Sequence, residues 1–147
     1  MTKRFLKKNS ACFGCPIGCG RKTRVDDERC AGEGEGPEYE TIYAMGSNCG
    51  IDNLAAITKA NYICNEAGMD TITAGSTIGC AMELFEKGLI SEEEIGMSLN
   101  FGEADNMVKL MEMTAKGEGF GKKIGLGSYR LADSYGVPEL SMSVKKL

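Results

Sequence analysis

The sequence contains no histidine. An imidazole metal ligand, a Cys–His or Ser–His nucleophile pair and an ordinary histidine pH switch are therefore excluded within this chain. No apolar run approaches the ~20 residues that span a bilayer, and residues 1–8 lack the apolar core of a secretory leader. A membrane role has no support. Because the seven cysteines are also an odd number, we expect a reducing cytoplasm and no disulfide framework.

Aromatic residues are scarce, at 7% of the chain. The chain has 147 residues, which is long enough for one domain. The net charge is −4, yet basic residues concentrate at the N-terminal end. Because aromatic residues do not alternate with these charges in a repeated pattern, we interpret the basic cluster as a solvated arm and expect no nucleic-acid binding.

Three of the seven cysteines lie close together in one motif. Cys12, Cys15 and Cys19 follow the order Cys-x2-Cys-x3-Cys, with glycine and proline between and beside them. Crowded thiolates repel one another unless a cation is shared, and flexible spacers let the sulfurs converge on one point. A tetrahedral metal or a cubane cluster normally takes one more protein ligand than this motif supplies. The motif therefore predicts an incomplete metal or iron–sulfur site.

Cys30 is a local candidate for the missing ligand. It lies in residues 26–36, a charged and glycine-rich segment that we interpret as a mobile loop, from which the thiol could return to the motif. An unliganded loop thiol is the other interpretation, so the fourth ligand stays open at this point.

Two carboxylates follow in the segment Gly36-Pro37-Glu38-Tyr39-Glu40-Thr41. In an extended segment Glu38 and Glu40 share a face, whereas on a helix they diverge. A solvated surface pair is the ordinary explanation of such a Glu-x-Glu pattern.

Helical periodicity dominates from Asn48 onward. Capping residues and apolar stripes predict helices from Asp52 to about Ala67, from Asp70 or Thr71 to Lys87-Gly88, a short one after Ser91, one over 103–116 and a last one that carries Phe120 to Tyr135. Cys64, Cys80 and several of the nine methionines lie in these stripes and are expected to fill the core.

These patterns predict a mainly α, multi-helical domain with short helices, a cysteine-rich N-terminal loop and little or no strand. Only residues 21–25 alternate enough to allow a short strand. We expect a basic lead, the cysteine loop and a Gly-rich linker over 1–35, followed by one helical unit over 36–147.

The ordered motifs resemble the aldehyde ferredoxin oxidoreductase family, the tungsten-pterin enzymes. The resemblance rests on the Cys-x2-Cys-x3-Cys motif, the Gly36–Thr41 segment, Asn48-Cys49-Gly50-Ile51-Asp52, the segment from Asn65 to Ile72 and the segment from Met82 to Leu89. It extends from about residue 8 to Lys145. The resemblance implies that the chain is the middle, helical domain of a protein some four times longer.

The resemblance also implies cofactors and roles. Family members oxidise a small aldehyde to a carboxylate at a tungsten (or molybdenum) bis-pterin, and pass electrons through a [4Fe-4S] cluster to ferredoxin. Cys12, Cys15 and Cys19 then correspond to three cluster ligands, the fourth being in a later domain. Glu40 corresponds to the carboxylate beside the metal. Residues implied to hold the pterin are Asn65, Gly68, Asp70 and Thr71, with Asn65 standing where the family pattern has Asp.

Two hypotheses of function follow. In the first, the chain is a fragment of a tungsten-pterin oxidoreductase, inactive and with incomplete cofactors by itself. Its expected partners are ferredoxin, the remaining domains of the parent enzyme and, in a homo-oligomer, further copies of itself. In the second, it is a free-standing electron-transfer or structural module in which Cys30 closes an iron–sulfur or zinc site.

Overall fold

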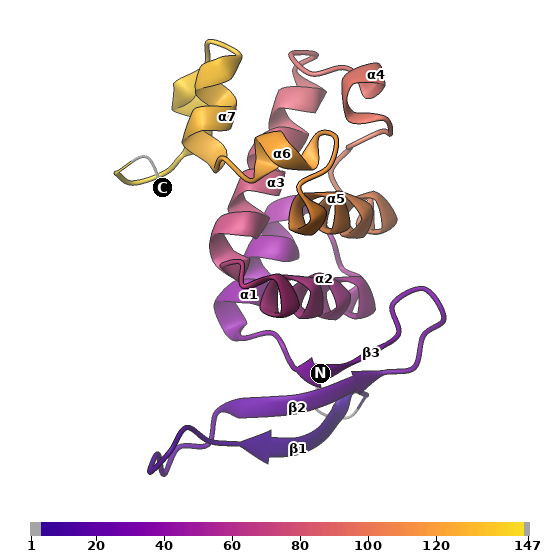
Figure 1. Cartoon of the computed structure of the whole chain (residues 1–147), viewed down its shortest axis with the longest axis vertical. Helices are drawn as coiled ribbons and strands as arrows, with labels where there is room; N and C mark the ends of the chain where they lie inside the picture. The colour runs from indigo at the N-terminus through magenta and orange to yellow at the C-terminus, as the bar shows by residue number, and fades with distance from the viewer. Residues whose placement is uncertain (1–3, 146–147) are drawn as a thin grey trace.

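The protein consists of a helical body with a small sheet at one end (Figure 1). The computed structural model describes residues 4–145. Three strands come first, β1 (Leu6–Ser10), β2 (Gly20–Val25) and β3 (Gly32–Glu35). Seven α-helices follow within the described residues: α1 (Tyr39–Met45), α2 (Leu54–Ala67), α3 (Thr71–Glu86), α4 (Glu92–Ile95), α5 (Ala104–Lys116), α6 (Gly121–Ile124) and α7 (Ser128–Ser134). Short 3-10 turns occupy Ser47–Cys49 and Pro138–Ser141. The mainly α fold class is confirmed.

The sheet is larger than the sequence predicts. Its order is β1-β2-β3, and both pairs are antiparallel. The segment interpreted as a mobile loop in fact contains β3, which places Glu35 opposite Lys22 and Glu33 opposite Arg24. These opposite-charge pairs favour the strand. A tertiary contact therefore overrides the low strand propensity of a Gly-rich sequence.

The glycines of β3 are needed where the sheet meets α2. The ring of Tyr62 lies so close that a Cβ on Gly32 would stand 2.8 Å from its Cδ2 atom. The Tyr62 hydroxyl is 2.7 Å from the Thr23 hydroxyl, and the side-chain amide of Asn61 donates to the carbonyl of Glu35 at 2.8 Å. These contacts fix the sheet against the helical body.

Helix starts follow the capping pattern with small shifts. Asp70 caps α3 by accepting a hydrogen bond from the Thr73 N–H at 2.6 Å, and Ser91 caps α4. For α2 the predicted cap Asp52 is wrong by one residue, because the Asn53 side chain accepts from the N–H groups of Ala55 and Ala56.

The last predicted helix is wrong in its continuity. Residues 120–135 form two helices, α6 and α7, separated at Gly125–Gly127. Gly127 has a φ of 86°, which a right-handed helix does not allow. The apolar stripe is nevertheless buried as expected, because Ile124 and Leu131 both lie in the core.

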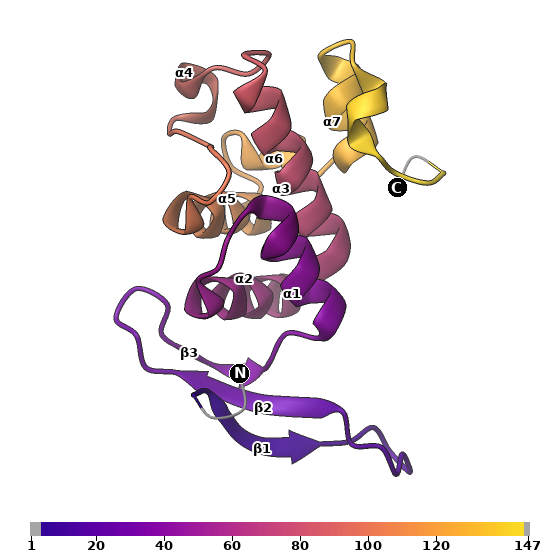
Figure 2. The same cartoon turned by 180° about the vertical axis from the view of Figure 1, so that it is seen from behind.

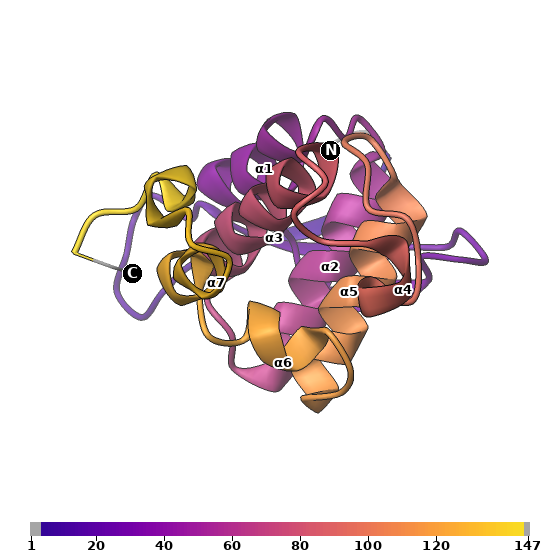
Figure 3. The same ribbon diagram turned by 90° about the horizontal axis from the view of Figure 1, so that it is seen from above.

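Of the two conformations considered for Gly36–Thr41, the structure has the helix from Tyr39 onward, where α1 begins. Thr41, Ala44 and Met45 are buried, and α1 packs along α3 as α2 packs along α5 (Figure 3). Burial against α3 thus stabilises a helix of seven residues, which is too short to be stable alone.

The core is filled by side chains of the helical stripes. Met45, Met82, Met107 and Met111 are fully buried, as predicted for core methionines, and Cys64 and Cys80 are buried with them. Within residues 4–145, no helix is both long and apolar enough to cross a membrane.

Close contact between α1 and α3 leads to a stability prediction. A Cβ on Gly75 would stand 2.8 Å from the backbone carbon of Ala44, whereas a Cβ on Gly79 would meet the movable side-chain amide of Asn48. We expect Gly75→Ala to lower the free energy of unfolding by roughly 1–3 kcal/mol, the cost typical of overpacking. Gly79→Ala should stay within about 1 kcal/mol, since Asn48 can rotate and alanine favours helix. Urea denaturation of both variants checks this, and equal losses would contradict it.

Candidate metal and cofactor sites

The three motif cysteines lie in one hairpin loop. Ser10 at the end of β1 pairs with Gly20 at the start of β2, so residues 11–19 form the connection and contain all three thiols. The loop turns tightly, with the N–H of Cys15 donating to the carbonyl of Cys12 at 3.0 Å. Gly14 and Gly18 have φ values of 71° and 59°, which explains the glycines of the motif. We call residues 11–19 the thiol loop.

The thiol loop extends beyond the helical body at one end of the sheet (Figure 2). Cys12 and Cys19 are exposed and Cys15 is half-buried. Phe13 and Ile17 are 108% and 79% exposed, which is unusual for large apolar side chains in a folded domain. The loop therefore presents thiols and apolar side chains together to solvent.

The remaining four thiols are not placed to complete this site. Cys30, Cys49, Cys64 and Cys80 are all buried in the core. Cys30 lies in the connection between β2 and β3, at the opposite end of β2 from the thiol loop, and the two ends of this six-residue strand are roughly 17 Å apart. Within residues 4–145, no three Cys, Asp or Glu side chains, the three loop thiols included, are grouped so that they could hold a metal ion. The fold therefore contradicts Cys30 as a fourth ligand.

The donor set of the thiol loop still fits an iron–sulfur cluster. Residues 11–19 contain three cysteines, whose sulfur atoms are soft ligands, and no histidine, aspartate or glutamate. Soft thiol ligands on one short loop suit iron–sulfur clusters. One side of the loop is open to solvent, so a ligand from another segment can approach.

The different environments of the cysteines predict their reactivity. Burial raises the pKa of Cys49 and of Cys64 to about 12 and that of Cys80 to about 11, and burial also raises the pKa of Cys30. A raised pKa leaves almost no reactive thiolate near neutral pH. At pH 8, we expect a disulfide reagent to modify only the three loop thiols quickly, and all seven after unfolding. Mass spectrometry of the labelled protein checks this, and fast labelling of a buried thiol in the folded state would contradict it.

The predicted catalytic and pterin residues lie at two neighbouring helix starts. The hydroxyl of Thr41, in the first turn of α1, is 2.7 Å from the hydroxyl of Thr71, the first residue of α3. Glu40 precedes Thr41 and is exposed, and Asp70 precedes Thr71 and is also exposed. Hydrogen bonding from the Thr73 backbone N–H lowers the pKa of Asp70, so this carboxylate is ionised at neutral pH.

Glu38 and Glu40 do not form a pair. Glu38 is the extended residue before α1 and lies 3.9 Å from the guanidinium of Arg21, whereas Glu40 belongs to the helix. The two carboxylates therefore lie in different surroundings, and Glu40 directly precedes Thr41 of the Thr41–Thr71 contact in the sequence.

Asn65 and Gly68 complete this corner at the end of α2. The carbonyl of Asn65 accepts from the N–H of Gly68, which has a φ of 68° and nothing within 4 Å of the position of a Cβ. Both residues are exposed. Open backbone at Gly68 beside exposed polar groups of Asn65 and Asp70 fits a flat, nitrogen-rich heterocycle such as a pterin. We call the exposed residues Asn65, Gly68 and Asp70, together with the half-buried Thr71, the pterin corner, after the cofactor that the sequence predicts there.

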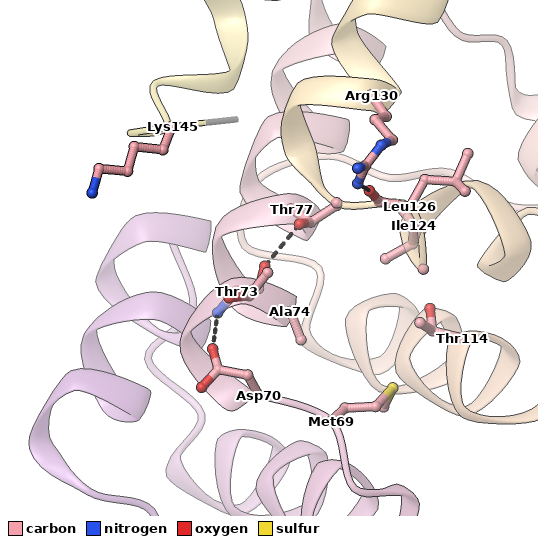
Figure 4. Close-up of a pocket in the computed structure, with 12 residues that line it drawn as sticks. Met69, Asp70, Thr73, Ala74, Thr77, Thr114, Ile124, Leu126, Arg130 and Lys145 are labelled. Carbon is pink, nitrogen blue, oxygen red and sulfur yellow. Dashed lines mark hydrogen bonds between the residues drawn. The ribbon is translucent and has the colours of Figure 1, made fainter. Parts of the chain in front are cut away.

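A cavity of about 540 Å³ adjoins the pterin corner (Figure 4). Asp70, Thr73 and Thr77 lie along its α3 wall, and Ile124 and Leu126 lie on the opposite side. Arg130 lies at its edge and donates to the carbonyl of Leu126 at 3.2 Å. The sequence gives no sign of this cavity, because its walls come from helices that meet only in the folded chain.

The fold and these sites define a mainly α domain with an exposed thiol loop and a polar helix corner, both open on one side. The family model described as aldehyde ferredoxin oxidoreductase, domains 2 & 3, matches residues 1–147. The chain belongs to this family.

Several curated relatives agree. A tungsten-containing aldehyde ferredoxin oxidoreductase of Pyrococcus furiosus is 52% identical over 100% of this chain and 24% of its own length. The protein of the same name from Thermococcus kodakarensis is 46% identical, with the same coverage. An aliphatic sulfonate oxidoreductase, WOR-like subunit, of Pyrococcus furiosus is 33% identical over 88% of this chain and 21% of its own. The chain thus spans about a quarter of these relatives.

A solved structure shares the fold. It is the active site complex BamBC of benzoyl coenzyme A reductase in complex with 1,5 dienoyl-CoA, with a TM-score of 0.73. The likeness covers 90% of this chain and 19% of that chain at 19% identity, so it shows the fold alone.

Proposed function

We propose that this chain is the cluster-binding and pterin-contacting part of a tungsten-pterin aldehyde oxidoreductase. The overall reaction is RCHO + H2O → RCOO⁻ + 3 H⁺ + 2 e⁻, with two one-electron ferredoxins as acceptors in the cytoplasm. The observation that carries the proposal is the exposed three-thiol loop on a chain that matches the family over its whole length.

Each group of residues has a role in this proposal. Cys12, Cys15 and Cys19 supply three ligands of a [4Fe-4S] cluster, and the fourth comes from a segment of the parent enzyme outside this chain. When bound, the tungsten bis-pterin supplies the two-electron redox chemistry. At the pterin corner, exposed amide, backbone and carboxylate groups accept hydrogen bonds from pterin N–H groups and orient the ring.

Glu40 is the proposed proton acceptor. Its helix is joined to the pterin corner by the Thr41–Thr71 hydrogen bond, and this contact supports a role for the Glu40 carboxylate near the proposed cofactor. In the parent enzyme, the other domains cover this glutamate. Its carboxylate oxygen then takes up one of the protons that aldehyde oxidation releases. In the isolated chain Glu40 is exposed, and we expect the isolated chain to be inactive.

A chimera tests the proposal. Residues 1–147 replace the matching segment of the Pyrococcus furiosus relative, and the purified protein is analysed for tungsten and iron and assayed for aldehyde-dependent viologen reduction. We expect activity from the chimera and none from the isolated chain. A chimera that is fully loaded with both metals and still inactive would contradict the proposal.

A further inference from the structure

Charge is strongly segregated along the chain. Residues 1–25 contain seven of the 17 Lys and Arg residues and none of the 21 Asp and Glu residues. In the structure, exposed basic residues of this segment lie on the two strands that lead into and out of the thiol loop, Lys7 and Lys8 on β1, and Lys22 and Arg24 on β2. We call these four residues the basic ribbon.

The basic ribbon projects away from the helical body. Along β2, Thr23 and Val25 are buried, while Lys22 and Arg24 alternate with them and are exposed. Since successive side chains of a strand point to opposite faces, Lys22 and Arg24 lie on the outer face. No lysine of this ribbon is needed for docking the sheet on α2.

Part of this charge is not neutralised within the domain. Arg24 forms an ion pair with Asp26 at 2.6 Å, and Glu35 stands opposite Lys22 on β3. Within residues 4–145, however, Lys7, Lys8 and Lys22 form no salt bridge. Lys8 and Lys22 are direct cross-strand partners, an arrangement of like charges that destabilises a sheet. A chain with a net charge of −4 thus keeps an unfavourable basic pairing at one place.

The basic ribbon adjoins the thiol loop, where the proposed iron–sulfur cluster passes electrons to an acceptor. Lys8 and Lys22 are each two residues from Ser10 and Gly20, which close the thiol loop. At a rise of about 3.3 Å per residue, the ribbon begins roughly 7 Å from the base of the loop. Any protein that binds the ribbon is therefore brought next to the thiols.

We propose that the basic ribbon is the docking surface for a small acidic electron-carrier protein. The inference rests on the proposed function, because that function requires a one-electron acceptor to approach the thiol loop. Complementary charge accelerates encounter and fixes orientation without a large contact area, which suits a carrier that must leave after each electron. A nucleic acid fits less well, since the ribbon contains only four basic residues and a single exposed aromatic ring, Phe13, lies in the adjoining thiol loop.

Binding to the chain itself tests the proposal. Purified chain is titrated with oxidised Pyrococcus furiosus ferredoxin by calorimetry at 20 mM and at 200 mM NaCl. The variant Lys7→Gln/Lys8→Gln/Lys22→Gln removes three charges without adding a carboxylate opposite Glu35. The matched control Lys109→Gln/Lys116→Gln/Lys122→Gln removes three exposed charges from α5 and α6.

We expect the ribbon variant to raise the Kd about tenfold at low salt and the control about twofold or less, with the difference shrinking at high salt as screening takes over. Circular dichroism confirms that both variants stay folded. Equal effects of the two variants, or ribbon-dependent binding to a DNA duplex with ferredoxin binding unchanged, would overturn the proposal. Because this titration needs no turnover, its failure is distinct from an inactive chimera.

Discussion

Replacing Cys15 by serine in the chimeric enzyme is expected to abolish the [4Fe-4S] cluster and with it electron transfer to ferredoxin. Cys15 lies at the centre of the thiol loop, and its N–H already bonds to the carbonyl of Cys12. A serine hydroxyl is a far poorer ligand for iron than a thiolate. Iron content and the electron paramagnetic resonance signal of the reduced protein measure the loss directly.

Cys30→Ser provides the matched control. The Cys30 thiol is buried beyond the opposite end of β2, so its replacement should leave the cluster signal unchanged. A buried hydroxyl in place of this thiol lowers stability by about 1–3 kcal/mol, which a thermal melt separates from cluster loss. Loss of the cluster in folded Cys30→Ser, or its retention in Cys15→Ser, would contradict the assignment of ligands.

Glu40→Gln in the chimera is expected to lower kcat for aldehyde oxidation by about 10²–10⁴, the usual contribution of a positioned acid or base. The amide has nearly the same shape but cannot take up a proton. Because Glu40 is exposed at the start of α1, the substitution should leave the fold unchanged. The measurement is kcat with a viologen acceptor, at matched tungsten and iron content.

Glu38→Gln is the control for this prediction. Glu38 lies two residues earlier, before the first residue of α1, and pairs with Arg21 at 3.9 Å. We expect its kcat to stay within about threefold of the parent protein, since a surface ion pair contributes little. Similar losses in the two variants would show that Glu40 acts through general surface charge and not as a proton acceptor.

The sequence was most informative where local interactions decide the structure. Asp70 and Ser91 cap helices through their own side chains, and Gly68 ends α2 through its own positive φ. Such signals act within a few residues and need no knowledge of the rest of the fold. The spans of α2, α3 and α5 were therefore predictable to within a residue or two.

The errors lie where distant contacts decide. β3 depends on pairing with β2 and on the ring of Tyr62 over Gly32. α1 depends on burial against α3, and no local pattern marks either event. The α6–α7 boundary depends on Gly127, whose positive φ is invisible in an otherwise continuous apolar stripe.

The candidate site shows the same division. The spacing of Cys12, Cys15 and Cys19 was enough to predict one compact loop, because it lies within a short stretch of sequence. The contact between Thr41 and Thr71 joins residues 30 positions apart and could not be foreseen. Nor could the burial of Cys30, since its segment is polar and its position depends on how the sheet docks.

Anchoring of the sheet by Tyr62 and Asn61 has a consequence for assembly. The pairing of Ser10 with Gly20 limits the thiol loop to residues 11–19, so forming the sheet restricts the separation of three thiols before any partner is present. The chain entropy of bringing these ligands near one another is lost when the sheet forms and not when metal binds. Within residues 4–145, the three loop thiols are not yet grouped to hold a metal, so grouping them needs only a local rearrangement of the nine-residue loop. In the proposed enzyme, the ligand from elsewhere then makes the one long-range closure.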